Sequence, residues 1–248
     1  MVCATRTVDP LLPAQTGTLN GLAFTVWLPP NPRPPARGGI VILHGAGSTK
    51  ESHYDYARAA VELGLGSICF DQRGHGESDG PMDGRVLDDV LMIAAHLRGV
   101  LGDRGAPLAL RGSSMGGYLA ILAAEPAAAQ AVVAICPASA SGLRRGLAAQ
   151  RFSFAADQTS LDAFLADHEL EPAAGSLRAP LLLMHAEGDE QVPIQQSREL
   201  AAIASGDGSR LVAVPGGHHR SIQHDAELQA VSLRFLERAL NLRPGPAR

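Results

Sequence analysis

The stretch that decides the fold runs from Pro107 to Leu122 and reads Pro-Leu-Ala-Leu-Arg-Gly-Ser-Ser-Met-Gly-Gly-Tyr-Leu-Ala-Ile-Leu. Its first four residues form a short apolar run typical of a buried strand, and the part from Tyr118 onward has the alanine and leucine content of a helix. Between them, residues 112–116 match the pattern Gly-x-Ser-x-Gly. A strand, a tight turn with two glycines and a helix form the context in which this pattern exposes a nucleophilic serine.

The positions of the glycines indicate which serine is exposed. In such a turn, the residues two before and two after the central one lie against neighbouring backbone, so they must be small. Gly112 and Gly116 meet this requirement around Ser114, whereas a turn centred on Ser113 would place Arg111 and Met115 at the crowded positions. We therefore predict Ser114 as the nucleophile.

A second match to the pattern, Gly-Glu-Ser-Asp-Gly, occupies residues 76–80. It follows a polar run and precedes Pro81, so neither a strand nor a helix flanks it. We interpret it as a glycine-rich loop, in which Ser78 is not a nucleophile.

Composition limits the class of protein. The 248 residues are 46% hydrophobic and 19% charged, which is enough apolar material for one large α/β domain spanning residues 1–248. The net charge of −4 and the lack of a lysine-arginine cluster argue against nucleic acid as a partner. No apolar run reaches the ~18 residues of a membrane span, and the first residues do not resemble a signal peptide.

The chain has three cysteines, Cys3, Cys69 and Cys136. The last two lie in apolar runs, so we expect buried free thiols and a cytoplasmic location. A catalytic thiol is the alternative, and we disfavour it because neither position reads as a turn.

The remaining apolar runs alternate between strand and helix patterns. Strands are expected over 18–28, which would pair antiparallel with the segment before it, and over 39–44, 67–70, 107–110, 130–136, 180–185 and 211–214. Helices are expected over 52–64, 86–100, 194–204 and 222–242, besides the one that follows Ser114. This alternation predicts a mostly parallel sheet with helices on both faces.

One segment, about residues 138–176, interrupts the alternation because it has no strand pattern. It holds three of the six phenylalanines, Phe152, Phe154 and Phe164. We predict a short cap insertion that includes one amphipathic helix, with Leu161, Phe164 and Leu165 on its apolar face. An extra-long crossover helix is the alternative.

A serine hydroxyl needs a base, and the base needs an orienting acid. In an open parallel sheet such groups follow the carboxyl ends of the strands. Asp189 follows the strand at 180–185, and His218 and His219 follow the strand at 211–214, which gives the chain order Ser, Asp, His. Asp189 is our predicted acid in place of Glu187 or Glu190, although a plain turn aspartate remains an alternative.

The loop after the strand at 39–44 offers the other expected element. The backbone N–H groups of Ala46 and Met115 are predicted to form an oxyanion hole, since small residues let the backbone approach a substrate. An ordinary glycine turn at residues 45–47 is the alternative.

Taken together, these motifs resemble those of the α/β-hydrolase family. They are His-Gly-Ala-Gly-Ser at 44–48, Asp-Gln-Arg-Gly-His-Gly-Glu-Ser at 71–78, Gly-Ser-Ser-Met-Gly-Gly at 112–117, residues 185–193 and Gly-Gly-His-His at 216–219. The resemblance covers about residues 18–240, and the loop at 71–78 is similar to that of the serine-aminopeptidase-like and lysophospholipase-like branch. Arg73 and His75 are then loop-forming rather than catalytic.

The resemblance favours His219 over His218 as the base, because it places a glycine three residues before the base and Gly216 stands there. The resemblance implies a serine hydrolase but not its substrate, and we predict a carboxylesterase type (EC 3.1.1) that cleaves esters of small or medium acyl groups through an acyl-enzyme. A thioesterase, lactonase, amidase or peptidase would use the same residues.

A non-catalytic binding module on the same fold is the alternative from another class. Phe152, Phe154 and Phe164 are expected nearest the acyl group of a small-molecule substrate, unless they only pack the cap onto the sheet. No cofactor or metal is expected.

Overall fold

The computed structural model describes residues 11–30 and 36–240, so Cys3 and residues 241–242 of the last expected helix lie outside the described residues. The strands are β1 (Gln15–Leu19), β2 (Leu22–Trp27), β3 (Gly39–Leu43), β4 (Gly66–Phe70), β5 (Leu108–Ser113), β6 (Ala131–Ile135), β7 (Leu181–Ala186) and β8 (Arg210–Val214). The helices are α1 (Tyr54–Glu62), preceded by a 3₁₀ turn η1 (Lys50–His53), then α2 (Val86–Val100), α3 (Met115–Ala123), α4 (Ala140–Ala148), α5 (Gln158–Asp167), α6 (Leu170–Ser176), α7 (Ile194–Ile203) and α8 (Ala226–Ala239). None of these helices is long and apolar enough to cross a membrane.

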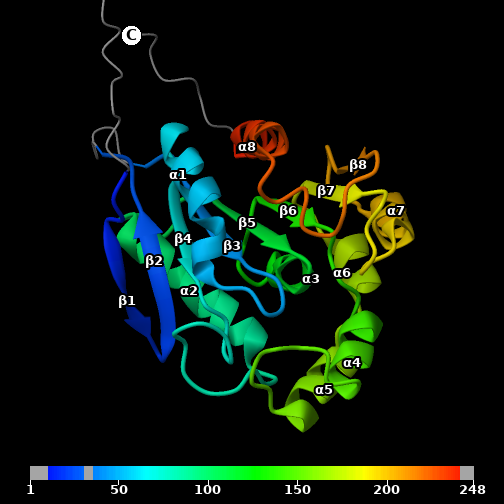
Figure 1. Cartoon of the computed structure of the whole chain (residues 1–248). Coiled ribbons are helices and arrows are strands. Elements are labelled where there is room, and N and C mark those ends of the chain that lie inside the picture. The colour runs from blue at the N-terminus through cyan, green and yellow to red at the C-terminus, as the bar shows by residue number, and fades with distance from the viewer. Residues whose placement is uncertain (1–10, 31–35, 241–248) are drawn as a thin grey trace, which may run out of the picture.

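The strands form one sheet in the order β1-β2-β4-β3-β5-β6-β7-β8 (Figure 1). Strand β2 is antiparallel to both of its neighbours, and all other pairs are parallel. The predicted mostly parallel α/β fold is confirmed. The parallel order β5-β6-β7-β8 brings the loops that follow these four strands to one edge of the sheet.

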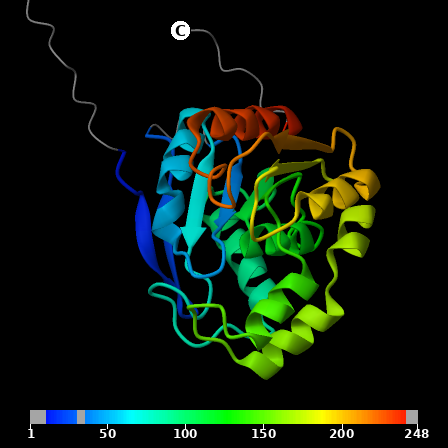
Figure 2. The ribbon, with the colours of Figure 1, turned by 45° about the vertical axis from the view of Figure 1, so that its right-hand side comes forward.

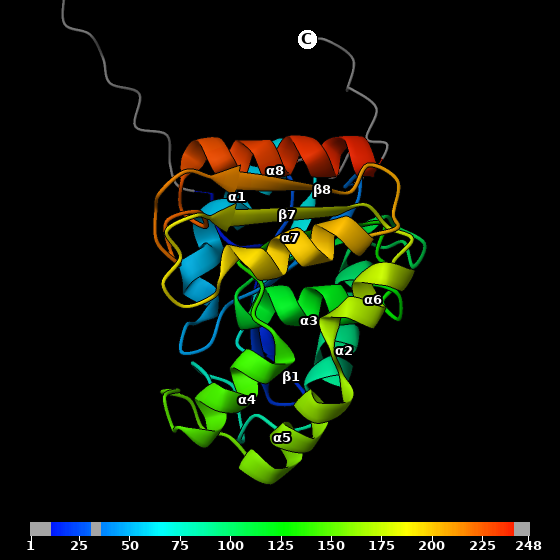
Figure 3. The ribbon, with the colours of Figure 1, turned by 90° about the vertical axis from the view of Figure 1, so that its right-hand side faces the viewer.

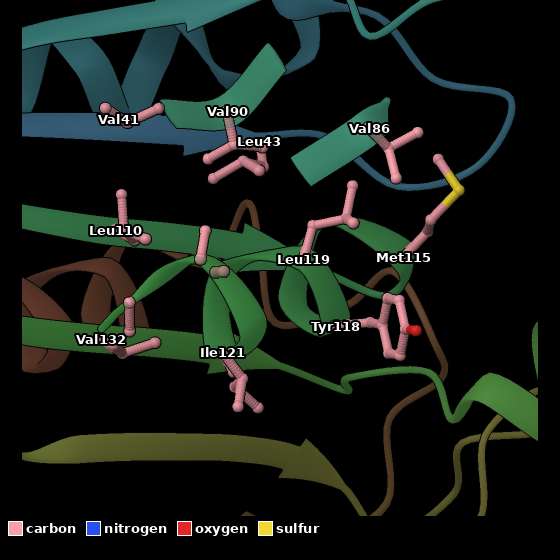
Figure 4. Packing of buried hydrophobic residues seen from close by; sticks show 14 of the residues in the cluster. Val41, Leu43, Val86, Val90, Leu110, Met115, Tyr118, Leu119, Ile121 and Val132 are labelled. Carbon is pink, nitrogen blue, oxygen red and sulfur yellow. The ribbon is translucent and has the colours of Figure 1, made fainter. Parts of the chain in front are cut away.

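The sheet has two apolar faces, because successive side chains of each strand point to opposite sides. Leu108 and Leu110 of β5 pack on the face covered by α2 and α3, where Val41, Val132 and Leu119 join them (Figure 4). The alternate residues, such as Ala109, pack beneath α1 and α8. Figure 2 shows α8 lying across that second face.

The first hairpin differs from the expected single strand over 18–28. Asn20 and Gly21 have positive φ angles of 48° and 81° and form the turn between β1 and β2. Asn-Gly is a strong signal for a two-residue hairpin turn, since both central residues need positive φ. The prediction of one strand across these residues was therefore wrong.

The last helix begins at Ala226 and not at Ile222. Asp225 caps it, because its side chain accepts the N–H of Leu228 at 2.9 Å. Ile222 is buried in the turn before the helix. His224 is exposed, and it lies in that turn and not inside the helix.

Three helices, α4, α5 and α6, occupy the segment between β6 and β7. Helix α5 buries Leu161, Phe164 and Leu165, as its apolar spacing predicted, whereas α4 and α6 were not predicted. Helices α4 and α5 lie at the end of the molecule opposite α8 (Figure 3). Arg144 of α4 and Asp162 of α5 form a salt bridge at 2.8 Å that joins these two helices.

Candidate active site

Ser114 occupies the sharp turn between β5 and α3. Its backbone has φ 53° and ψ −118°, a strained conformation for a residue with a side chain. A side chain at Gly112 would overlap the Gly116 carbonyl, and one at Gly116 would overlap the carbonyls of Leu43 and His44. The two glycines are therefore required by close backbone approach, as the sequence pattern predicted.

Backbone hydrogen bonds hold this turn against the end of β6. The N–H of Ser114 donates to the carbonyl of Ile135 at 2.9 Å, and the N–H of Ala138 donates to the carbonyl of Ser114 at 3.1 Å. The strain of the turn is thus maintained by neighbouring elements.

Asp189 and His219 come together from the loops after β7 and β8. Oδ2 of Asp189 accepts the Nδ1–H of His219 at 2.7 Å, and Oδ1 accepts the N–H groups of Gln191 and Val192 at 2.8 and 2.9 Å. Burial acts to raise the pKa of Asp189, but the hydrogen bonds from His185, His219 and the two amides outweigh it and lower that pKa. Asp189 is therefore ionised at neutral pH.

His219 and His218 have different surroundings. The side chain of His219 is 7% exposed and directed at Asp189, whereas His218 is exposed, and both its N–H and its carbonyl bond to Ser221. In the part of the chain that the structure describes, neither Nε2 of His219 nor Oγ of Ser114 has a hydrogen-bond partner. The structure thus brings His219 to Asp189 but shows no hydrogen bond between Nε2 of His219 and Oγ of Ser114.

His185 is a neighbour of Asp189 that the sequence reasoning missed. Its Nε2 lies 3.3 Å from Oδ2 of Asp189 and donates to the carbonyl of Val192 at 2.9 Å. Its Nδ1 bonds Ser197 of α7 at 2.7 Å. The position of His185 inside strand β7 gave the only signal, since a histidine in an apolar strand must find buried polar partners.

The loop 44–48 lies beside Ser114. The N–H groups of Ala46 and Met115 make no hydrogen bond within residues 11–30 and 36–240, so both remain available to a ligand. The next N–H, that of Gly47, donates to Nε2 of His75 at 3.1 Å. His75 thereby supports this loop, a contact that the sequence did not reveal.

His44 ties the same loop to residue 72. Its Nε2 accepts the N–H of Gln72 at 3.0 Å, and its Nδ1 donates to the carbonyl of Gly45 at 2.8 Å. Burial and the nearby His75 lower its pKa to about 4, so the ring is neutral at pH 7. These hydrogen bonds fix one tautomer of His44 and, through it, the course of the loop.

The loop 71–80 is held by its own polar groups. Oγ of Ser78 donates to the carbonyl of Asp71 at 2.6 Å and accepts the N–H of Ala23 at 2.9 Å. Arg73 forms a two-point salt bridge with Asp89 of α2. Ser78 and Arg73 are thus occupied in stabilising the loop.

An apolar pocket adjoins Met115 on the side of α4 and α5. Its lining is apolar, and the side chains leave little free space between them. Met115, Val86 and Tyr118 meet at this pocket (Figure 4). The full lining is Met82, Val86, Met115, Tyr118, Leu119, Leu143, Leu147, Phe152, Phe154, Leu161, Phe164 and Leu165. All three phenylalanines expected near a substrate therefore line one pocket, next to the residue that follows Ser114.

Cys69 and Cys136 are buried free thiols, as predicted. Contrary to the sequence reading, Cys136 does lie at a turn, with φ 43° directly after β6. Its Sγ and the donor atoms of Asp189 and His219 lie within 4.8 Å of one another, a ligand set of the kind that binds metals. Both oxygens of Asp189 already accept hydrogen bonds and burial raises the pKa of Cys136, so these residues fit a metal poorly.

The sheet order and the strained turn at Ser114 define the chain as an α/β-hydrolase. Within that class, the family model described as serine aminopeptidase, S33, matches residues 34–159, just over half of the chain. The chain belongs to this family. Among curated proteins, it is 26% identical to YfhR of Escherichia coli O157:H7 over 239 residues, which cover 90% of this chain and 79% of YfhR.

Solved structures with the same fold include two lipases and a protein solved with ferulic acid bound. A monoacylglycerol lipase of Paleococcus ferrophilus is 22% identical with a TM-score of 0.66, over 89% of this chain and 98% of that one. A monoglyceride lipase of Saccharomyces cerevisiae is 16% identical with a TM-score of 0.74, over 97% and 98%. Est1E of Butyrivibrio proteoclasticus is 20% identical with a TM-score of 0.69, over 92% and 98%.

Proposed function

We propose that this protein is a serine hydrolase that cleaves carboxylic esters of small or medium acyl groups. The observation that carries the proposal is the hydrogen bond from His219 to the buried carboxylate of Asp189, at the same sheet edge as the strained Ser114. The three residues follow β5, β7 and β8, whose carboxyl ends lie side by side with that of β6. The monoacylglycerol and monoglyceride lipases among the similar folds support ester chemistry.

In the proposed reaction, Nε2 of His219 removes the proton of the Ser114 hydroxyl as Oγ attacks the acyl carbon. The carbonyl oxygen becomes an oxyanion, which accepts hydrogen bonds from the N–H groups of Ala46 and Met115. The imidazolium then gives the proton to the leaving alkoxide. A water molecule attacks the acyl-enzyme by the same steps, which releases the acid and restores Ser114.

The pocket next to Met115 suits the acyl chain. Because Met115 would contribute both an oxyanion N–H and a pocket side chain, an acyl group bound at Ser114 would lie beside this apolar lining. We assign α4, α5 and the loop that joins them the role of a cap, in which Phe152, Phe154 and Phe164 contact the acyl group. The lining side chains leave little free space in the pocket, which favours small and medium chains over long ones.

A fluorophosphonate probe tests the nucleophile. The wild-type protein should be labelled at Ser114, and Ser114→Ala should lose both labelling and hydrolysis of p-nitrophenyl esters. Ser113→Ala and Ser78→Ala are the matched serine controls and should retain labelling, although Ser78→Ala loses two loop hydrogen bonds and some stability. Labelling that persists in Ser114→Ala would refute the proposal.

A further inference from the structure

Arg111 is a buried cation that the proposed reaction does not use. It lies in β5 three residues before Ser114, and its side chain is fully buried. Burying a charge costs several kcal/mol unless it is compensated. Yet among the residues that the structure describes, no carboxylate lies within 4.0 Å of its guanidinium.

The partners of Arg111 are neutral groups from three other elements. Nη1 donates to Nδ1 of His53 at 3.1 Å, and Nη2 donates to the carbonyl of Gln223 at 3.2 Å. The guanidinium carbon lies 3.9 Å from the centre of the Tyr56 ring, a cation–π contact. Burial and the charge of Arg111 keep the pKa of His53 well below its usual value, so its ring accepts this hydrogen bond as a neutral group.

The Gln223 carbonyl is the point where these contacts converge. It also accepts from Nε2 of Gln229 in α8 at 2.9 Å, and the same amide group donates to Oδ2 of Asp55 at 2.8 Å. The carbonyl is therefore fixed from β5 and from α8 at once. It belongs to the segment 216–223, which carries His219 four residues earlier.

Most of the other hydrogen bonds between segment 216–223 and the rest of the protein are made with the loop after β7. Gly188 donates to the carbonyl of Gly216 at 2.9 Å, and Asp189 and Glu190 bond His219. These contacts fix the segment relative to Asp189 but not relative to Ser114. Arg111 supplies the hydrogen bond from the strand that leads into Ser114.

We propose that Arg111 is a positioning residue that sets the distance between His219 and Ser114. Its side chain reaches from β5 to the Gln223 carbonyl. This hydrogen bond fixes the position of segment 216–223 relative to the strand that leads into Ser114. Two hydrogen bonds and the Tyr56 ring offset only part of the cost of the buried charge, because the Nε of Arg111 has no hydrogen-bond partner among the described residues. This proposal rests on the proposed serine hydrolase function.

Arg111→Met tests it, because methionine keeps an unbranched apolar chain but removes the charge and both hydrogen bonds. The variant should melt at or above the wild-type temperature, since a buried charge is gone. Its kcat on a p-nitrophenyl ester, per serine titrated to completion with a fluorophosphonate, should fall by about 10- to 100-fold, the scale of a 1 Å misplacement. KM should change little, and amide hydrogen exchange over residues 216–225 should become faster.

Arg98→Met is the matched control. Arg98 of α2 also donates to backbone carbonyls, those of Ala127 and Ala128 at 2.9 and 3.0 Å, but lies away from Ser114 and His219. This variant should keep the wild-type kcat and the wild-type exchange over 216–225.

A wild-type kcat per titrated serine in Arg111→Met would overturn the proposal, as would unchanged exchange over 216–225. Should Arg111→Met not fold, Arg111→Lys decides, because a single ammonium cannot reproduce the two-pronged geometry of the guanidinium. An intermediate kcat with faster exchange supports positioning, and wild-type values for both overturn it. Failure of the wild-type protein to label or hydrolyse esters would instead refute the proposed function.

Discussion

Asp189 divides its two carboxylate oxygens between its own loop and His219. Oδ1 binds the N–H groups of Gln191 and Val192, while Oδ2 accepts from Nδ1 of His219 at 2.7 Å. The loop therefore holds the carboxylate through Oδ1, which leaves Oδ2 to orient the imidazole of His219. This arrangement fixes the tautomer of His219 in which Nε2 is the proton acceptor.

Asp189→Asn should reduce kcat by about 10⁴-fold, because an asparagine amide can bind the imidazole in the wrong tautomer. Glu187→Gln is the control, since Glu187 is half-exposed and bonds Arg198 on the surface at 3.3 Å. Steady-state rates on one activated ester measure both variants. Near-normal turnover in Asp189→Asn would move the acid elsewhere, and Glu187 would become the next candidate.

His219→Ala should lose nearly all turnover, whereas His218→Ala should retain most of it. His219 bonds Asp189 and is nearly buried, while His218 faces solvent and bonds within its own loop. Assays of the two variants on the same ester separate them, with circular dichroism to confirm folding. A loss confined to His218→Ala would reverse the assignment.

The local patterns of the sequence predicted the parts of the structure that depend on neighbouring residues. The apolar runs marked the strands, and the spacing of Gly112 and Gly116 marked the turn at Ser114, because backbone crowding acts within a few residues. The meeting of Asp189 with His219 followed from chain order in a parallel sheet. Their catalytic role stays a prediction.

Contacts between side chains distant in the sequence were not predictable in this way. Three examples are the contacts of His185 with Asp189, of His75 with the Gly47 amide and of Arg111 with Gln223. Each contact depends on side-chain rotamers and on the packing of separate elements. Cys136 was misjudged because an apolar run does not show where its strand ends. The start of α8 was predicted wrongly because the cap residue Asp225, and not the first apolar residue Ile222, sets where the helix begins.

The acyl preference should depend on the pocket phenylalanines. Phe164→Ala removes a ring from the pocket wall, so the rate optimum on a series of p-nitrophenyl esters should shift to longer chains. Loss of the ring also lowers stability by about 3–5 kcal/mol, the usual cost for a buried phenylalanine. Phe235→Ala is the control, because Phe235 is buried beneath the other face of the sheet. An unchanged optimum in Phe164→Ala would mean that the ring only packs α5.

The last prediction concerns stability in acid. His44 has a pKa of about 4 in the folded protein against 6.5 in a model peptide, because burial and His75 disfavour its charged form. The unfolded chain therefore binds more protons than the folded one between these values, and stability falls as pH drops from about 6.5 to 4. The loss from this residue approaches about 3 kcal/mol at the acid end. His53, whose pKa is also well below its usual value, acts in the same direction.

His44→Gln should remove the part of this dependence that His44 causes. A glutamine oxygen can still accept the N–H of Gln72, as Nε2 of His44 does at 3.0 Å, but it cannot take up a proton in this range. Urea unfolding at pH 7 and pH 5 should then show a smaller difference in unfolding free energy than in the wild-type protein. His218→Gln, an exposed histidine in a surface turn, should leave the difference unchanged. An equal pH dependence in His44→Gln and the wild type would mean that the folded protein protonates His44 without cost, and acid sensitivity would then have to arise at His53.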